Sequence, residues 1–218
     1  MQGVFSQVAV MGSSGMLLCA LILLWRRGVE AYISAFMWQS VVLGALTAAV
    51  GYFGDDPQLY VVAVLLFAIK AVAIPKLLRR VAQRFTAGRE SAPYVNTATS
   101  LVVSGLLVLL AHAATRPLEA IADVPTRAGM PLAMGLLFIS LFIIVSRKLA
   151  ITQVIGFLML ENAIALLAVL ATYGVPLIVE LGVFLDALMG FIVMQIFLYD
   201  IHDTFSTTDV DVLKRLKH

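Results

Sequence analysis

Charged residues are scarce in this chain of 218 residues: 13% are charged, whereas 61% are hydrophobic. Soluble domains carry roughly a quarter charged residues. This composition therefore excludes an ordinary soluble domain and indicates an integral membrane protein. The net charge of +2 is small, so the position of each charge along the chain is more informative than their sum.

Residues that bind metals or form disulfides are also few. The chain has one cysteine, Cys19, and three histidines that lie far apart in the sequence. A disulfide needs two cysteines, and zinc or iron–sulfur sites need clustered ligands. There is also no glycine-rich phosphate loop and no Ser/His/Asp arrangement. We therefore expect no metal, no cofactor and no active site of the chain's own.

Apolar stretches of helix length fill most of the sequence and alternate with short polar connections. A membrane-spanning helix needs roughly 20 mostly apolar residues, and this alternation is the strongest evidence that a single sequence offers. We predict an all-α integral membrane protein with seven transmembrane helices. Their approximate ranges are Val4–Trp25, Ala31–Phe53, Leu59–Leu78, Ala98–Thr115, Pro131–Val145, Ile151–Tyr173 and Val175–Tyr199. The first is expected to stay as a span, because no basic segment of a cleaved signal peptide precedes it.

Basic residues are concentrated on one side of these predicted spans. The connections after the first, third and fifth spans, together with the tail, contain Arg26, Arg27, Arg79, Arg80, Arg84, Arg89, Arg147, Lys148, Lys214, Arg215 and Lys217. The opposite side contains only Arg116 and Arg127. Because short basic loops stay in the cytoplasm, we predict that the N-terminus lies outside and the C-terminus is cytoplasmic.

Several charged residues lie inside the predicted spans. Lys70, Glu161 and Asp186 are near the middle of three different spans, and Glu180 is closer to the outer end of the last one. Charges at that depth are energetically costly, so they usually mark a functional site. We predict that Lys70, Glu161 and Asp186 form a proton or ion relay, which Glu180 extends outward. A static ion pair that holds the bundle together is the alternative.

Neighbouring residues are predicted to support this relay. Gln153 lies eight positions before Glu161, so it falls on nearly the same helix face and could bridge gaps in the path. Asn162 is expected to face a different direction. Pro75 follows Lys70 by about one turn and cannot donate to the helix ladder, which predicts a bend or a bound water there.

Two histidines are possible auxiliary members of the proton path. His112 lies near the outer end of the fourth predicted span, and His202 follows the last span on the predicted cytoplasmic side. Imidazole can exchange protons near neutral pH. For each of them, an ordinary polar residue at the membrane interface is the more usual role.

The same residues resemble the hydrogenase-4 component E family, whose members are membrane subunits of energy-converting nickel–iron hydrogenases. The resemblance covers nearly the whole chain. It is carried by Lys70 with Pro75, Gln153-x-x-Gly156, Glu161-Asn162, Pro176-x-x-Val179-Glu180-x-Gly182, Asp186-Ala187, and the tail from Asp209-Val210-Asp211 to Leu216-Lys217. The last two predicted spans are also similar to the K subunit of respiratory complex I and the C subunit of Mrp-type antiporters.

The resemblance implies three regions: a five-helix membrane region (1–149), a K-subunit-like transmembrane hairpin (150–202) and a cytoplasmic tail (203–218). It implies a multi-pass protein of the prokaryotic cytoplasmic (inner) membrane. The expected partners are antiporter-like membrane subunits, a membrane subunit of the quinone-site type, a peripheral redox arm and the lipid bilayer, with no nucleic acid.

The implied function is a non-catalytic subunit whose relay couples redox chemistry elsewhere to proton or sodium translocation. One alternative is a structural scaffold subunit, of such a complex or of an Mrp-type antiporter, without a relay of its own. An independent secondary transporter is a further alternative, but it would show internal inverted repeats, and none is evident in the sequence.

Overall fold

The computed structural model describes residues 2–26, 28–85, 94–121 and 127–172. The described residues form helices and no strands, which confirms the all-α prediction for this part of the chain. The helices are α1 (Gln2–Trp25), α2 (Val29–Gly54), α3 (Gln58–Leu65), the π-helix η1 (Leu66–Ala73), α4 (Ile74–Phe85), α5 (Thr97–Ile121), the short 3₁₀-helix η2 (Arg127–Gly129), α6 (Met130–Ser146) and α7 (Ala150–Thr172).

Six stretches of the described chain are long and apolar enough to cross a membrane. They are Val4–Trp25, Val29–Gly54, Gln58–Gln83, Thr97–Pro117, Arg127–Ser146 and Ala150–Ala171. The first six predicted spans are therefore confirmed in position. The seventh, Val175–Tyr199, lies outside the described residues, and the orientation in the membrane stays a prediction.

The third span is longer than the sequence predicted. The sequence predicts a span that ends near Leu78, but the helix continues to Phe85. The reason is that the added turns are amphipathic. Val81 and Ala82 are buried, whereas Arg80 is exposed, so the helix keeps an apolar face against α2 beyond the end of the purely apolar run.

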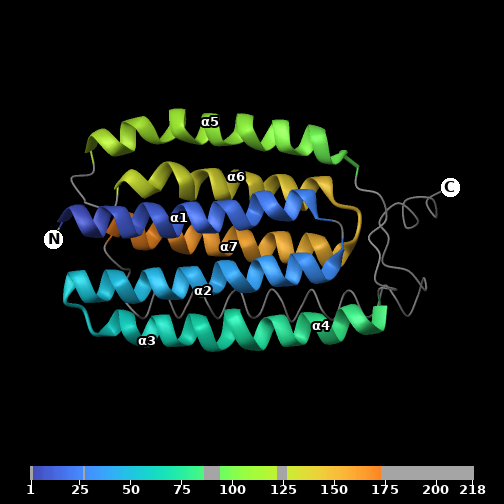
Figure 1. Cartoon of the computed structure of the whole chain (residues 1–218), viewed down its shortest axis with the longest axis horizontal. Coiled ribbons are helices and arrows are strands. Elements are labelled where there is room, and N and C mark those ends of the chain that lie inside the picture. Colours follow the sequence, from blue (N-terminus) through green and yellow to red (C-terminus); the bar gives the residue numbers. More distant parts are fainter. Residues whose placement is uncertain (1, 27, 86–93, 122–126, 173–218) are drawn as a thin grey trace.

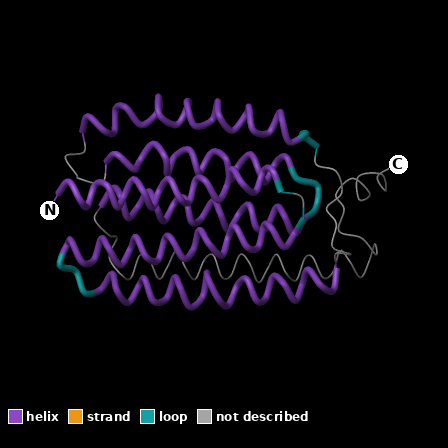
Figure 2. Tube along the Cα trace, in the orientation of Figure 1, coloured by secondary structure: helices purple, strands orange, loops and turns teal. Residues whose placement is uncertain are grey.

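The helices lie side by side, and successive spans run in opposite directions (Figure 1). Four of them, α1, α2, α6 and α7, pack in a ring, each against the next. Helix α5 packs on the outside of α6, and the continuous span α3–η1–α4 packs on the outside of α2. Short loops such as 147–149 join neighbouring spans (Figure 2). Most described basic residues lie at the end of the bundle that contains this loop.

Polar side chains at the helix termini fix where the helices begin and end. The backbone N–H of Thr99 donates to Asn96 Oδ1 at 2.8 Å, which caps the start of α5. Between α2 and α3, Asp55 adopts a left-handed conformation with φ of 53°, and the N–H of Gln58 donates to Asp56 Oδ1 at 2.9 Å. These contacts satisfy backbone groups that a helix leaves unpaired at its ends.

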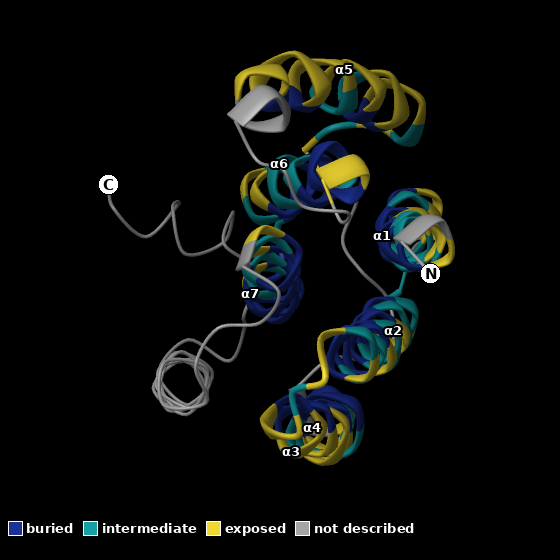
Figure 3. Cartoon of the chain, turned by 90° about the vertical axis from the view of Figure 1, so that its left-hand side faces the viewer, coloured by how far each residue is buried: buried dark blue, intermediate teal, exposed yellow. Residues whose placement is uncertain are grey.

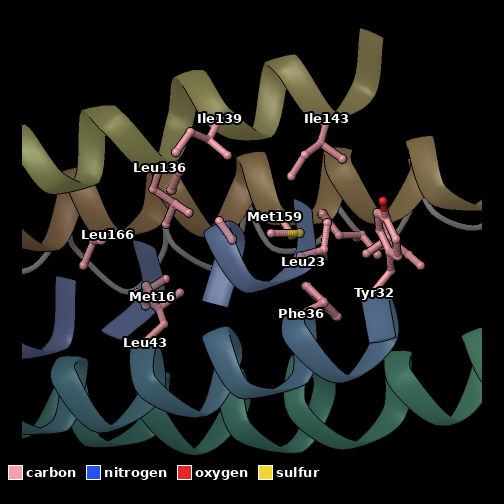
Figure 4. Close-up of a cluster of buried hydrophobic side chains, with 14 of the residues drawn as sticks. Met16, Leu23, Tyr32, Phe36, Leu43, Leu136, Ile139, Ile143, Met159 and Leu166 are labelled. Carbon is pink, nitrogen blue, oxygen red and sulfur yellow. The ribbon is translucent and has the colours of Figure 1, made fainter. Parts of the chain in front are cut away.

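The core lies inside the ring of four helices. Figure 4 shows side chains from α1, α2, α6 and α7 meeting there, among them Met16, Phe36, Leu136 and Met159, all fully buried. In contrast, the outer helix α5 is exposed over most of its surface (Figure 3). Its exposed side chains include large apolar ones such as Leu109, as expected for a helix that faces lipid.

A glycine allows the closest packing of α7 on α6. A Cβ atom at Gly156 would lie 3.0 Å from Ile143 Cγ2 and 3.0 Å from Ile144 Cγ1. Small residues of this kind let the backbones of membrane helices approach each other. The two isoleucines are branched and already packed, so they have little room to yield.

We predict that Gly156→Ala lowers the free energy of unfolding by about 1 to 3 kcal/mol, because the added methyl overpacks this contact. The matched control is Gly105→Ala on α5, where a Cβ would meet nothing within 4 Å. That change should be neutral, or stabilising by up to about 1 kcal/mol. Thermal unfolding of the two variants in detergent micelles measures the difference. Equal effects would show that α6 and α7 do not pack as described.

Candidate functional site

The candidate site is centred on Lys70. This residue belongs to the π-helix η1, and its side chain is buried inside the helix bundle. Lys70 is 3% exposed and lies near the midpoint of the span Gln58–Gln83. The N–H of Ile74 donates to the carbonyl of Ile69 in the wider π-helical pattern, and Pro75 follows with no N–H to donate. The sequence predicts a bend or a bound water near Pro75, and that stays a prediction. The structure has a π-helical segment, Leu66–Ala73, just before it, and such segments are frequent at functional sites.

Lys70 forms an ion pair with Glu161 of α7. The distance from Lys70 Nζ to Glu161 Oε2 is 3.5 Å, and the two side chains are 3% and 10% exposed. Glu161 is near the midpoint of its own span, Ala150–Ala171. Two of the three residues predicted to share one depth are thus in contact, and each carries a charge in a place where unpaired charges are strongly disfavoured.

The amide of Asn162 gives Lys70 a second partner. Lys70 Nζ donates to Asn162 Oδ1 at 3.2 Å, and Asn162 Nδ2 donates to Ser40 Oγ at 3.1 Å. Asn162 leaves α7 about 100° away from Glu161, in line with the prediction that it faces a different direction. The ammonium at the end of the long lysine side chain nevertheless lies within reach of both residues.

A chain of hydrogen bonds leads from Lys70 through Asn162 to Ser40 of α2, and each group in it donates to the next one. The Ser40 hydroxyl donates to the carbonyl of Phe36 at 2.9 Å, so its oxygen is left to accept. Asn162 must then present its NH₂ group to Ser40 and its oxygen to Lys70. An amide does not titrate near neutral pH. This branch therefore positions the ammonium, while Lys70 and Glu161 are the groups that can exchange a proton.

The auxiliary residues lie away from this network. Gln153 Nε2 donates to the carbonyl of Arg147 at 2.8 Å, and Gln153 is about 12 Å from Glu161 along the helix axis. His112 is exposed on α5, the outer helix on the far side of the bundle from α3 and α4 (Figure 1). The structure therefore does not bring Gln153 or His112 to the ion pair. Asp186, Glu180 and His202 lie outside the described residues.

Sequence reasoning missed Ser40 altogether. The available signal was the polar pair Gln39-Ser40, which interrupts the apolar run of the second span at about its middle. Both residues are fully buried.

No candidate metal site is evident in the described part of the chain, which contains no group of three or more His, Cys, Asp or Glu side chains that could hold an ion.

Comparison of the sequence with known proteins places the chain in a family. No protein-family model matches the chain, and no solved structure matches it significantly. The chain is 36% identical over 214 residues to the uncharacterized protein Rv0085 of Mycobacterium tuberculosis, covering 98% of this chain and 97% of that protein. The chain belongs to the same family as Rv0085.

More distant relatives of this chain have names that indicate a function. Hydrogenase-4 component E of Escherichia coli (strain K12) and of Shigella flexneri are each 24% identical to it over 202 residues, covering 93% of this chain and 94% of theirs. The resemblance to hydrogenase-4 component E is thus supported as distant homology over most of the chain. The similarity to the complex I K subunit and the Mrp C subunit stays a prediction.

We predict that Lys70 and Glu161 are energetically coupled. Lys70→Met and Glu161→Gln should each destabilise the protein by about 3 to 5 kcal/mol, because each removes one partner of a buried pair. The double variant should lose less stability than the two single variants lose together, and the difference, the coupling energy, should be about 0.5 to 3 kcal/mol. Unfolding of all three variants in detergent micelles measures this cycle.

The control is Lys76→Met, which removes an exposed lysine from the same span. It should change stability by no more than about 0.5 kcal/mol. Strict additivity of the two site variants would mean that the ion pair contributes nothing to the fold.

Proposed function

We propose that this protein is a non-catalytic membrane subunit of a multisubunit, energy-converting redox complex of the nickel–iron hydrogenase type. Its role is to provide an intramembrane proton relay that couples redox chemistry in other subunits to proton or sodium translocation. The observation that carries the proposal is the Lys70–Glu161 ion pair, buried near the midpoints of two apolar spans. The homology to hydrogenase-4 component E over 93% of the chain supports the class of complex.

The relay works through the charge state of the pair. A proton that reaches Glu161 neutralises the carboxylate and removes its attraction for the Lys70 ammonium. Lys70 is still held by Asn162 Oδ1 at 3.2 Å, so it stays in place while its own proton becomes easier to release. Charge changes at the redox arm would drive this exchange, because two titratable groups in contact respond to any nearby charge.

The remaining parts of the proposal concern residues and partners beyond the described helices. Asp186 and Glu180, in a seventh span, extend the relay toward an outer surface. The N-terminus lies outside a prokaryotic inner membrane and the C-terminus lies in the cytoplasm. The partners are antiporter-like subunits, a quinone-site-type membrane subunit and a peripheral redox arm. The basic residues gathered at one end of the bundle support this orientation.

We predict that Glu161→Gln and Lys70→Met abolish most ion translocation even in complexes that retain all their subunits, although both variants are less stable than wild type. Asp186→Asn should do the same. The controls are two exposed positions: Glu30→Gln on α2 removes a carboxylate that is paired with Arg79 near the surface, and Lys76→Met, in the same span as Lys70, removes an exposed lysine. Both controls should keep normal translocation.

The measurement is redox-driven ion uptake by membrane vesicles that contain the whole complex, with redox turnover and subunit co-purification followed separately. Full coupled activity in Glu161→Gln and Lys70→Met would rule out the relay. Loss of co-purifying subunits before any loss of coupling would instead identify the protein as a scaffold, for which the ion pair is a structural contact.

A further inference from the structure

An open groove lies between α1 and α2, at the end of the bundle where these two helices are joined. Its volume is about 620 Å³, which is within the usual range of small-molecule sites. Ile22 and Trp38, which line it from α1 and α2, are 50% and 57% exposed, so the groove opens to the outside of the bundle. Figure 3 shows α1 and α2 along one side of the bundle and α6 and α7 along the other.

The walls of the groove are charged at its mouth and apolar farther along the helices. Arg26, directly after α1, and Glu30, in the first turn of α2, line the mouth. Ile22 and Trp38 lie about 6 to 12 Å deeper along the helix axes. Trp25, next to Arg26, is 73% exposed, and exposed tryptophans mark the headgroup level of a membrane. The groove therefore matches an amphiphile with its polar end at Arg26 and an apolar chain below.

The charges at the mouth favour an anion. Glu30 Oε2 lies 3.4 Å from Arg79 Nε, so a cation of α4 already compensates this carboxylate. Arg26 is exposed and forms no ion pair with any residue that the structure describes. The three side chains together carry one positive charge. The guanidinium of Arg26 has several N–H donors in one plane, a geometry that suits phosphate oxygens.

We propose that this groove is a binding site for an anionic phospholipid, whose phosphate lies at Arg26 and whose acyl chain lies between Ile22 and Trp38. Basic pockets between membrane helices bind anionic headgroups in this way. A phospholipid without net charge carries an ammonium group that Arg26 repels, so it binds more weakly. The site is separate from the proposed relay, because neither Lys70 nor Glu161 lines the groove.

The test uses Trp38 as a reporter inside the groove. The chain has two tryptophans, so the full-length Trp25→Phe protein fluoresces from Trp38 alone. Delipidated protein in detergent micelles is titrated with phosphatidylglycerol or phosphatidylethanolamine, both with the same brominated acyl chains, which quench a tryptophan that they touch. Phosphatidylglycerol should quench Trp38 saturably, with half-saturation at a roughly fivefold lower mole fraction, the contribution of about one basic residue. Identical curves for the two lipids, or quenching that never saturates, would overturn the proposal.

Two charge variants should move the affinity in opposite directions. Arg26→Gln should remove the preference for phosphatidylglycerol, whereas Glu30→Gln should strengthen it, because it removes the one negative charge at the mouth and releases Arg79. Arg80→Gln, which removes an exposed arginine of α4 that does not line the groove, is the matched control and should keep the wild-type preference. If Arg26→Gln and Arg80→Gln weakened binding equally, the effect would be one of overall charge and the assigned site would be wrong.

A variant that fills the groove distinguishes a lipid from other occupants. Ala35 lines the groove and is partly exposed, so Ala35→Leu should take up space there without disturbing the core. It should abolish the saturable quenching and leave the composition of the purified complex unchanged. Loss of a partner subunit from the complex, or conversion of a dimer of this chain to a monomer, would show that a protein helix occupies the groove and would overturn the proposal.

Discussion

A lysine ammonium in the middle of an apolar bundle is stable only where other groups replace the water that it has lost. Lys70 has two such groups, Glu161 Oε2 at 3.5 Å and Asn162 Oδ1 at 3.2 Å. Both come from α7, whereas Lys70 belongs to η1, and both of these helices pack against α2. The charge therefore ties the third and sixth spans together across the second, in a region where hydrophobic burial alone gives no such specificity.

The two partners of Lys70 differ in what they can do. Glu161 can change its charge, whereas Asn162 cannot, and the orientation of the asparagine amide is fixed by the Ser40 hydroxyl behind it. A relay needs both properties at once, because a group that loses its ionic partner must not swing away. A structural ion pair uses the same second contact, because a buried ammonium has three donors to satisfy. The asparagine contact is therefore consistent with the relay that we propose, and it also stabilises the buried charge.

Much of this architecture is predictable from the sequence, because apolar runs report membrane spans directly. Depth within a run also identified Lys70 and Glu161. The contacts were harder to predict, since they depend on how the helices pack. The π-helical turns at Lys70, the approach of Asn162 and Ser40, and the burial of Arg147 all follow from tertiary structure. In the sequence, Arg147 is simply one of several basic residues in short loops, and hydropathy cannot distinguish a covered arginine from an exposed one.

The π-helix Leu66–Ala73 has a consequence for how the third span tolerates change. Its wider turns change the direction in which the side chains of α4 point relative to those of α3. As a result, Val62 before the π-helix and Leu78 after it are both buried. Deleting a single residue in this segment would leave an apolar helix of nearly the same length. Every side chain beyond the deletion would nevertheless rotate by about 100° around the axis. Arg79 would then face away from Glu30, and the span would cross the membrane with its second half turned toward the wrong neighbours.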